Sequence, residues 1–224
     1  MAEPGGAGDR ESPTLHMPEW EFQRIYGRWS PLLPTQVLRL FAGVPFTWWV
    51  VGGWSLEADP RRPRRPHEDI DVAFPAHDLP AVRERLASYH LWQAGPPGLR
   101  PLLPGEDLRA ECEQLWVRRD AYSPWLLDLL LTPVDGDEWV YKRDRRIRRP
   151  LRDVIRTGPD GVPYQVPEIA MLFKSRHLRD KDRQDLDVTL SRLDEPARRW
   201  LHESLALTAP AHPWLDQIVS AGTG

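Results

Sequence analysis

Hydrophobic positions along this chain follow two different patterns. Before about residue 166, the apolar segments are short, and stretches rich in proline, glycine and charge separate them. This is typical of short strands and helices. After that point, apolar residues recur at helical spacing over three segments. The pattern predicts a mixed α/β part followed by a helical part.

The individual elements follow from the same pattern. We expect strands at residues 46–51, 70–74, 91–94, 114–118 and 125–131, edge strands at 139–141 and 145–147, and a hairpin joining 154–156 to 164–166. Helices are expected at 19–29, 34–41, 76–90, 167–177, 182–193 and 196–207.

Composition and charge exclude several classes of protein. The net charge of -3 gives no support to a nucleic-acid-binding protein, because such domains tend to be basic. A single cysteine, Cys112, rules out an intramolecular disulfide. The longest apolar run, at residues 46–54, is too short to span a bilayer. We therefore expect a cytoplasmic protein that neither spans a membrane nor has nucleic acid as its partner.

The most informative feature is a glycine pair followed by two carboxylates. Gly52 and Gly53 end an apolar run, and Asp69 and Asp71 lie two residues apart in a strand-like segment. Side chains at i and i+2 of a strand point to the same face, so these carboxylates would repel each other unless a cation lies between them. Glycine amides can approach a phosphate closely. Alone, an Asp-x-Asp pair is often a solvated turn, but the combination favours a Mg²⁺–nucleotide site.

Residues 48–75 resemble the active-site region of the nucleotidyltransferase superfamily, which has the fold of DNA polymerase β. More narrowly, they resemble the aminoglycoside 2″-nucleotidyltransferase-like family, with the lincosamide nucleotidyltransferases close to it. The residues that carry the resemblance are Val51-Gly52-Gly53-Trp54-Ser55 and Arg65-Pro66-His67-Glu68-Asp69-Ile70-Asp71-Val72-Ala73-Phe74-Pro75. The chain departs from the family at Ser55, where alanine is usual, and in its proline-broken basic loop.

The resemblance implies a fold and a chemistry. It implies an α+β nucleotidyltransferase fold, in which helices flank a mixed β-sheet and a helical region follows. We accordingly expect residues 1–18 to be disordered, 19–166 to form the catalytic domain and 167–224 to form the C-terminal helical region. The cofactors would be two Mg²⁺ ions, with ATP or another nucleoside triphosphate as co-substrate. Gly52, Gly53 and Ser55 would hold the phosphates.

A third carboxylate is expected at Asp128, in the middle of the apolar run 125–131. A buried charge is costly unless it is paired or binds metal. Asp128 either forms a salt bridge with one of the many arginines or completes a metal-binding triad with Asp69 and Asp71. The family places its third acidic residue in this part of the chain, so we favour the triad. Asp128 would then be a metal ligand, the general base for the acceptor hydroxyl, or both.

Basic residues offer further contacts to a nucleotide. Lys174 lies beside the apolar side of a predicted helix, where it either reaches a triphosphate or is a solvated surface charge. His67 is expected to orient a neighbour by a hydrogen bond, since no second His or Cys lies at metal-binding spacing. Within the basic loop, one of Arg61, Arg62, Arg64 and Arg65 is a further candidate for a phosphate contact.

Three functions fit these features. The first is a nucleotidyltransferase that adenylates a hydroxyl of a small molecule, above all an aminoglycoside-type antibiotic. The second is a nucleotidyltransferase toxin that modifies a protein or tRNA, and the third is a nucleotide-binding module without turnover. A cationic aminoglycoside requires an acidic cleft, and six carboxylates are candidates to line it: Glu57, Glu111, Glu113, Asp135, Asp137 and Glu138. The sequence does not indicate an oligomeric state.

Overall fold

A computed structural model describes residues 18–95 and 98–221 of the 224-residue chain. The segment predicted to be disordered, 1–18, lies almost wholly outside the described residues. A mixed eight-stranded sheet forms the centre of the molecule, in the order β10-β11-β1-β2-β6-β5-β3-β4. Its strands are β1 (Trp49–Val50), β2 (Asp71–Pro75), β3 (His90–Ala94), β4 (Arg100–Pro101), β5 (Gln114–Arg118), β6 (Trp125–Thr132), β10 (Ile155–Thr157) and β11 (Pro163–Gln165).

Two pairs of neighbouring strands in this sheet are parallel, β1 with β11 and β2 with β6, and the other pairs are antiparallel. A second sheet has the order β7-β8-β9. Its strands are β7 (Val134–Asp135), β8 (Glu138–Val140) and β9 (Arg148–Pro150). The predicted α+β class with a mixed sheet is therefore confirmed.

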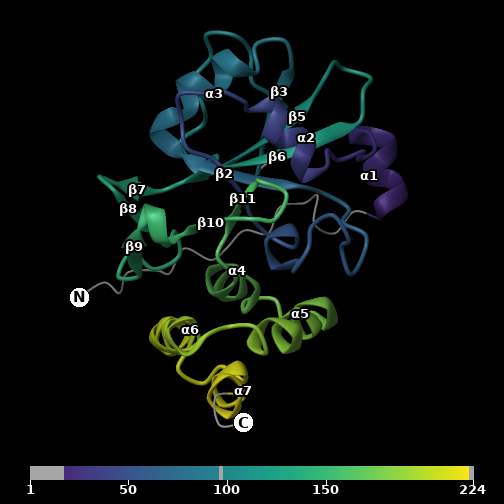
Figure 1. Ribbon diagram of the computed structural model, residues 1–224. Helices are drawn as coiled ribbons and strands as arrows, with labels where there is room; N and C mark the ends of the chain where they lie inside the picture. The colour runs from purple at the N-terminus through teal and green to yellow at the C-terminus, as the bar shows by residue number, and fades with distance from the viewer. Residues whose placement is uncertain (1–17, 96–97, 222–224) are drawn as a thin grey trace, which may run out of the picture.

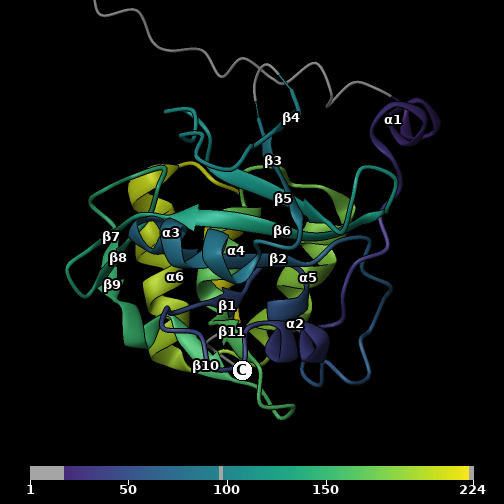
Figure 2. The same cartoon turned by 90° about the horizontal axis from the view of Figure 1, so that it is seen from above.

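Helices cover both faces of the central sheet (Figures 1 and 2). The α-helices are α1 (Glu19–Tyr26), α2 (Pro34–Leu40), α3 (Leu79–Arg85), α4 (Pro167–Lys174), α5 (Asp180–Leu190), α6 (Glu195–Thr208) and α7 (Trp214–Ser220). Short 3₁₀ turns in the described residues are η2 (Trp54–Leu56), η3 (Ala76–Asp78) and η4 (Leu151–Asp153). Figure 1 shows α4 to α7 stacked below the sheet, with α2 and α3 on its other side.

The two faces of the sheet bury two separate apolar clusters. Val50 and Val72 point toward a cluster that includes Val37 of α2 and Val82 of α3. Their neighbours Trp49 and Ala73 point the other way, toward the buried side chains of α4 to α7. Successive strand residues face opposite sides of a sheet, so this alternation also fixes the face of Asp71, which is the face covered by α4. The C-terminal helices thus share a core with the sheet, while the division into two domains stays a prediction.

Several predicted elements differ in extent. The strand predicted at 70–74 begins at Asp71, so Asp69 lies in the preceding loop. The helix predicted at 76–90 is a 3₁₀ turn followed by the short α3, because the chain turns at Leu86–Tyr89 to enter β3.

The edge strand predicted at 145–147 is wrong. That segment is a turn closed by the Tyr141 amide donating to the Ile147 carbonyl, and the strand follows it as β9. The strands β4 and β7 and the helix α7 were not predicted. No helix in the described part of the chain has the length and apolarity needed to cross a bilayer.

Candidate active site

The strands β2 and β6 bring two of the predicted carboxylates together. These strands are parallel neighbours, and Asp71 pairs directly with Asp128 in their register. Asp128 is buried, Asp71 is partly buried, and Asp69 is exposed in the loop before β2. All three line one cavity of about 550 Å³. The residues predicted as the triad therefore meet at a single site.

The negative charges of Asp71 and Asp128 are destabilised by burial and by neighbouring carboxylates, which raises both pKa values. Burial, together with the charge of Asp69, raises the pKa of Asp71 to about 7. Burial and the charges of Asp71 and Asp69 raise the pKa of Asp128 well above its ordinary value. Asp128 Oδ2 accepts a hydrogen bond of 3.2 Å from Gln114 Nε2, while its buried Oδ1 has no partner within the described residues.

The chemistry of these donors fits a magnesium ion. Carboxylate oxygens are the ligands that Mg²⁺ prefers, and a cation beside them would relieve the repulsion that raises both pKa values. In the described ranges, no three His, Cys, Asp or Glu side chains are already grouped to hold a metal. Asp71 and Asp128 would therefore be ligands of the ion, and the exposed Asp69 would be a third ligand.

The glycine pair lines the cavity directly beside Asp71. Gly52 has a φ of +66°, and a Cβ there would lie 2.4 Å from Asp71 Oδ2. A Cβ on Gly53 would lie 2.8 Å from His67 Nδ1. Both positions thus require glycine for the backbone to come this close. Ser55 lies behind the turn, where it is buried and its hydroxyl donates to the Gly52 carbonyl at 2.8 Å. It does not line the cavity, and its contact with a phosphate stays a prediction.

His67 is held in place beneath the turn. Its Nε2 lies 2.9 Å from Glu57 Oε1, and its ring stacks on Trp54 with 4.2 Å between the ring centroids. Burial lowers the pKa of His67 despite the hydrogen bond to Glu57. The geometry is that of an orienting residue.

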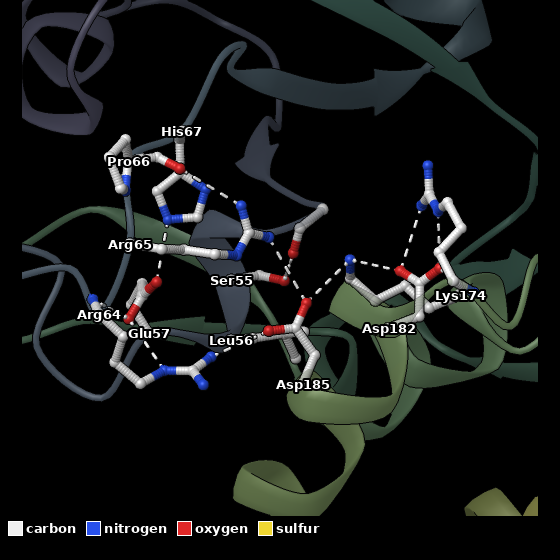
Figure 3. A network of polar contacts seen from close by, with 12 residues as sticks. Ser55, Leu56, Glu57, Arg64, Arg65, Pro66, His67, Lys174, Asp182 and Asp185 are labelled. Carbon is white, nitrogen blue, oxygen red and sulfur yellow. Dashed lines mark hydrogen bonds and ion pairs between the residues drawn. The ribbon is translucent and has the colours of Figure 1, made fainter.

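A cluster of ion pairs joins the basic loop before β2 to α4 and α5 (Figure 3). Lys174 Nζ lies 3.2 Å from Asp182 Oδ1 and 3.1 Å from Asp185 Oδ2, and both aspartates are buried. Asp185 also pairs with Arg64 at 3.1 Å and with Arg65 at 3.5 Å. One buried carboxylate therefore fixes three cations, of which Lys174 and Arg65 line the cavity.

Arg65 is the least satisfied of these cations. Its Nε is buried and has no hydrogen-bond partner in the part of the chain that the structure describes. Its Nη2 would lie 3.0 Å from a Cβ on Gly53. The guanidinium therefore lies against the glycine turn, and not all of its N–H groups are used in hydrogen bonds, so it could also donate to an anion.

Sequence reasoning missed two parts of this site. Gln114 reaches Asp128 from the neighbouring strand β5, and no local pattern marks it. Asp185 lies three positions after Asp182 on the same face of α5, and this spacing was a usable signal.

The acidic cleft expected for a cationic acceptor is absent from this cavity. None of the six candidate carboxylates lines it. Glu57 is buried against Arg64 and His67, Glu113 pairs with Lys142, and Asp135 and Glu138 pair with Arg148. That expectation was wrong for the cavity, because long-range ion pairs occupy most of these side chains.

Comparisons with known proteins agree with this architecture. Residues 34–94 match the family described as aminoglycoside-2″-adenylyltransferase. No curated protein sequence matches the chain. The solution structure of the antibiotic-resistance factor ANT(2″)-Ia is 12% identical, with a TM-score of 0.52 over 84% of this chain and 95% of that chain. The crystal structure of ANT(2″)-Ia in complex with adenylyl-2″-tobramycin is 12% identical, with a TM-score of 0.51 over 79% of this chain and 98% of that chain.

The structural likeness shows a shared fold, and the family match covers the glycine turn, the first two carboxylates and the strands around them. Residues 34–94 are therefore similar to the aminoglycoside-2″-adenylyltransferase family, and the chain shares the fold of the two ANT(2″)-Ia structures.

Proposed function

We propose that this protein transfers a nucleoside monophosphate, AMP from ATP, to a hydroxyl of a small-molecule antibiotic in a Mg²⁺-dependent reaction that releases pyrophosphate. The observation that carries the proposal is the placement of Asp71 and Asp128. They are register partners on neighbouring parallel strands, and they line one cavity with a glycine turn that packs against Asp71. The matched family supplies the aminoglycosides as first candidates for the acceptor.

The basic side of the cavity would bind the triphosphate. Amides of Gly52 and Gly53 can donate to phosphate oxygens, as free amides do in glycine-rich turns. Lys174 and Arg65 add positive charge, and Asp185 holds both of them in position. Arg179 and Lys181 also line this side. Together they orient the α-phosphorus toward Asp71 and Asp128.

The carboxylate side would activate the acceptor. When bound, two Mg²⁺ ions neutralise the triphosphate and lower the pKa of the attacking hydroxyl. Asp69, Asp71 and Asp128 would hold them. Asp128 accepts the hydroxyl proton, and Gln114 fixes its second oxygen. The acceptor oxygen bonds to the α-phosphorus, the bond from that phosphorus to the bridging oxygen breaks, and pyrophosphate leaves.

Pyrophosphate release tests this proposal. The protein would be assayed with ATP, GTP, CTP and UTP in the presence of Mg²⁺ against a panel of aminoglycosides and lincosamides. Asp69→Asn is the matched control, because Asp69 is exposed and its loss leaves the fold intact. We expect release that depends on the acceptor and is lost in the variant.

The other outcomes separate the competing functions. Labelled ATP that marks protein or tRNA in a lysate, without antibiotic-dependent release, would replace the small acceptor by a macromolecule. Normal binding of Mg²⁺–nucleotide without transfer to any acceptor would indicate a binding module.

A further inference from the structure

The cavity has two chemically different sides. Arg65, Lys174, Arg179 and Lys181 come from the basic loop, α4, α5 and the turn between these helices, and they lie on the side of the glycine turn. Asp128 lies on the other side, next to Gln114. Because the attacking hydroxyl must reach Asp128 in the proposed function, the acceptor would occupy this second side. We call it the acceptor wall.

The acceptor wall is apolar and basic. Its side chains come from β6, the segment after it, β8, the turn after β8 and α4. Those that border it are Leu130, Pro133, Trp139, Lys142, Arg143 and Phe173. The part of the lining that the structure describes has four carboxylates, and three of them are the predicted triad. The fourth, Glu68, lies next to Asp69 in the loop before β2.

The two cations of the wall are held in place. Lys142 Nζ lies 2.8 Å from Glu113 Oε2, and its charge acts on Asp128. Arg143 donates to the Phe173 carbonyl at 3.0 Å, and its guanidinium lies 5.3 Å from the centre of the Phe173 ring. Within the described residues, Arg143 makes no ion pair with a carboxylate. A positive group of the acceptor would meet the charge of Arg143 here, while the one lining carboxylate outside the triad, Glu68, lies in the loop before β2.

From this lining we infer, on the basis of the proposed transfer, that the acceptor is a hydroxylated small molecule with an apolar part and at most one positive charge. A polycation is disfavoured at the acceptor wall. The apolar part packs on Leu130, Pro133 and Phe173, while its hydroxyl reaches Asp128.

A set of three probes isolates the charge of the acceptor. Tobramycin is a polycation, and tobramycin acetylated on every amine keeps its hydroxyls without the charge. Lincomycin adds a probe with one amine and an apolar part. With Mg²⁺ and ATP, we expect kcat/KM for the acetylated compound or lincomycin to exceed that for tobramycin by about tenfold or more. This ratio should fall as salt rises, because ions screen the repulsion.

Charge reversal at the wall gives a second test. Lys142→Glu adds one carboxylate and frees Glu113, so it should reduce the discrimination against tobramycin by about tenfold or more. Arg145→Glu is the matched control, because Arg145 is exposed in the same segment and does not line the cavity. It should leave the ratio unchanged. Surface ion pairs contribute little to stability, so both variants should fold.

Binding distinguishes a failure of this inference from a failure of the proposed function. Calorimetry with Mg²⁺ and α,β-methylene-ATP measures the affinity for each probe without turnover. If tobramycin binds weakly and either other probe binds tightly, the inference about the acceptor is supported. If in addition no pyrophosphate forms, the proposed nucleotidyl transfer is refuted while the inference about the acceptor stands. If tobramycin binds as tightly as the other two probes or more tightly, and is adenylated as fast, the inference is overturned but the proposed transferase activity is supported. Failure of all three probes to bind also overturns it.

Discussion

Replacing Gly52 with alanine tests the close approach of the glycine turn to the carboxylates. Gly52 has a φ of +66°, where an L-residue costs about 1–2 kcal/mol. The new Cβ would also lie 2.4 Å from Asp71 Oδ2, a separation that side chains do not tolerate. Forcing Asp71 away adds about 1–3 kcal/mol of overpacking strain. The free energy of unfolding should therefore fall by about 2–5 kcal/mol.

Gly43→Ala is the matched control for this substitution. Gly43 has a φ of +70°, and no atom of another residue lies within 4 Å of a Cβ built there. It should lose only the backbone contribution of about 1–2 kcal/mol. Any excess loss in Gly52→Ala then reports the contact with Asp71.

Denaturant unfolding and pyrophosphate release would measure the two effects. A displacement of a reacting group by about 1 Å can lower the rate by about 100-fold, so Gly52→Ala should lose about that much activity. Gly43→Ala should keep its activity. The reasoning is refuted if Gly52→Ala is no less stable than Gly43→Ala and turns over as fast as the unsubstituted protein.

Three further substitutions follow from the same site. In chelator at pH 8, Asp128→Asn should raise the free energy of unfolding, because it removes a charge that burial and Asp71 disfavour, and it should abolish pyrophosphate release; a destabilised variant contradicts this. Asp182→Asn should lower stability at pH 7 by about 2 kcal/mol, because it removes charge-assisted hydrogen bonds from Lys174 and Arg179. Burial opposes the charged form of Asp182, but Arg179 and Lys174 outweigh it and lower the pKa, so this contribution is present above about pH 4 and is lost at lower pH; equal slopes of stability against pH in both proteins would argue otherwise. Arg65→Gln should raise KM for ATP by about tenfold with little change in kcat, and an unchanged KM would remove Arg65 from the phosphate site.

Local sequence signals predicted the catalytic elements well. The apolar run 125–131 predicted β6 almost to the residue, because a short continuous apolar run is typical of a buried strand. The family resemblance implied that Asp69, Asp71 and Asp128 lie at one site, and the parallel pairing of β2 with β6 is what brings Asp71 and Asp128 side by side. Hydrophobic periodicity does not specify that two strands more than fifty residues apart are neighbours.

The charges around the site were harder to predict. Glu57 and Glu113 were candidates for an acidic cleft, yet each pairs with a cation instead. Asp185 pairs with Arg64, which is 121 residues away in the chain. A carboxylate in a polar segment has the same sequence signal whether it lines a cavity or forms such an ion pair. The strands β4 and β7 were missed because each has too few residues to show a period.

The position of the label in the product tests the central claim most directly. The protein would be incubated with Mg²⁺, a hydroxylated acceptor and ATP labelled either at the α-phosphate or at the γ-phosphate, with Asp69→Asn alongside. The account predicts that α-label enters the acceptor, that γ-label leaves as pyrophosphate, and that neither occurs in the variant. Transfer of the γ-label to the acceptor would contradict nucleotidyl transfer, because it would mean that the site moves a phosphoryl group instead.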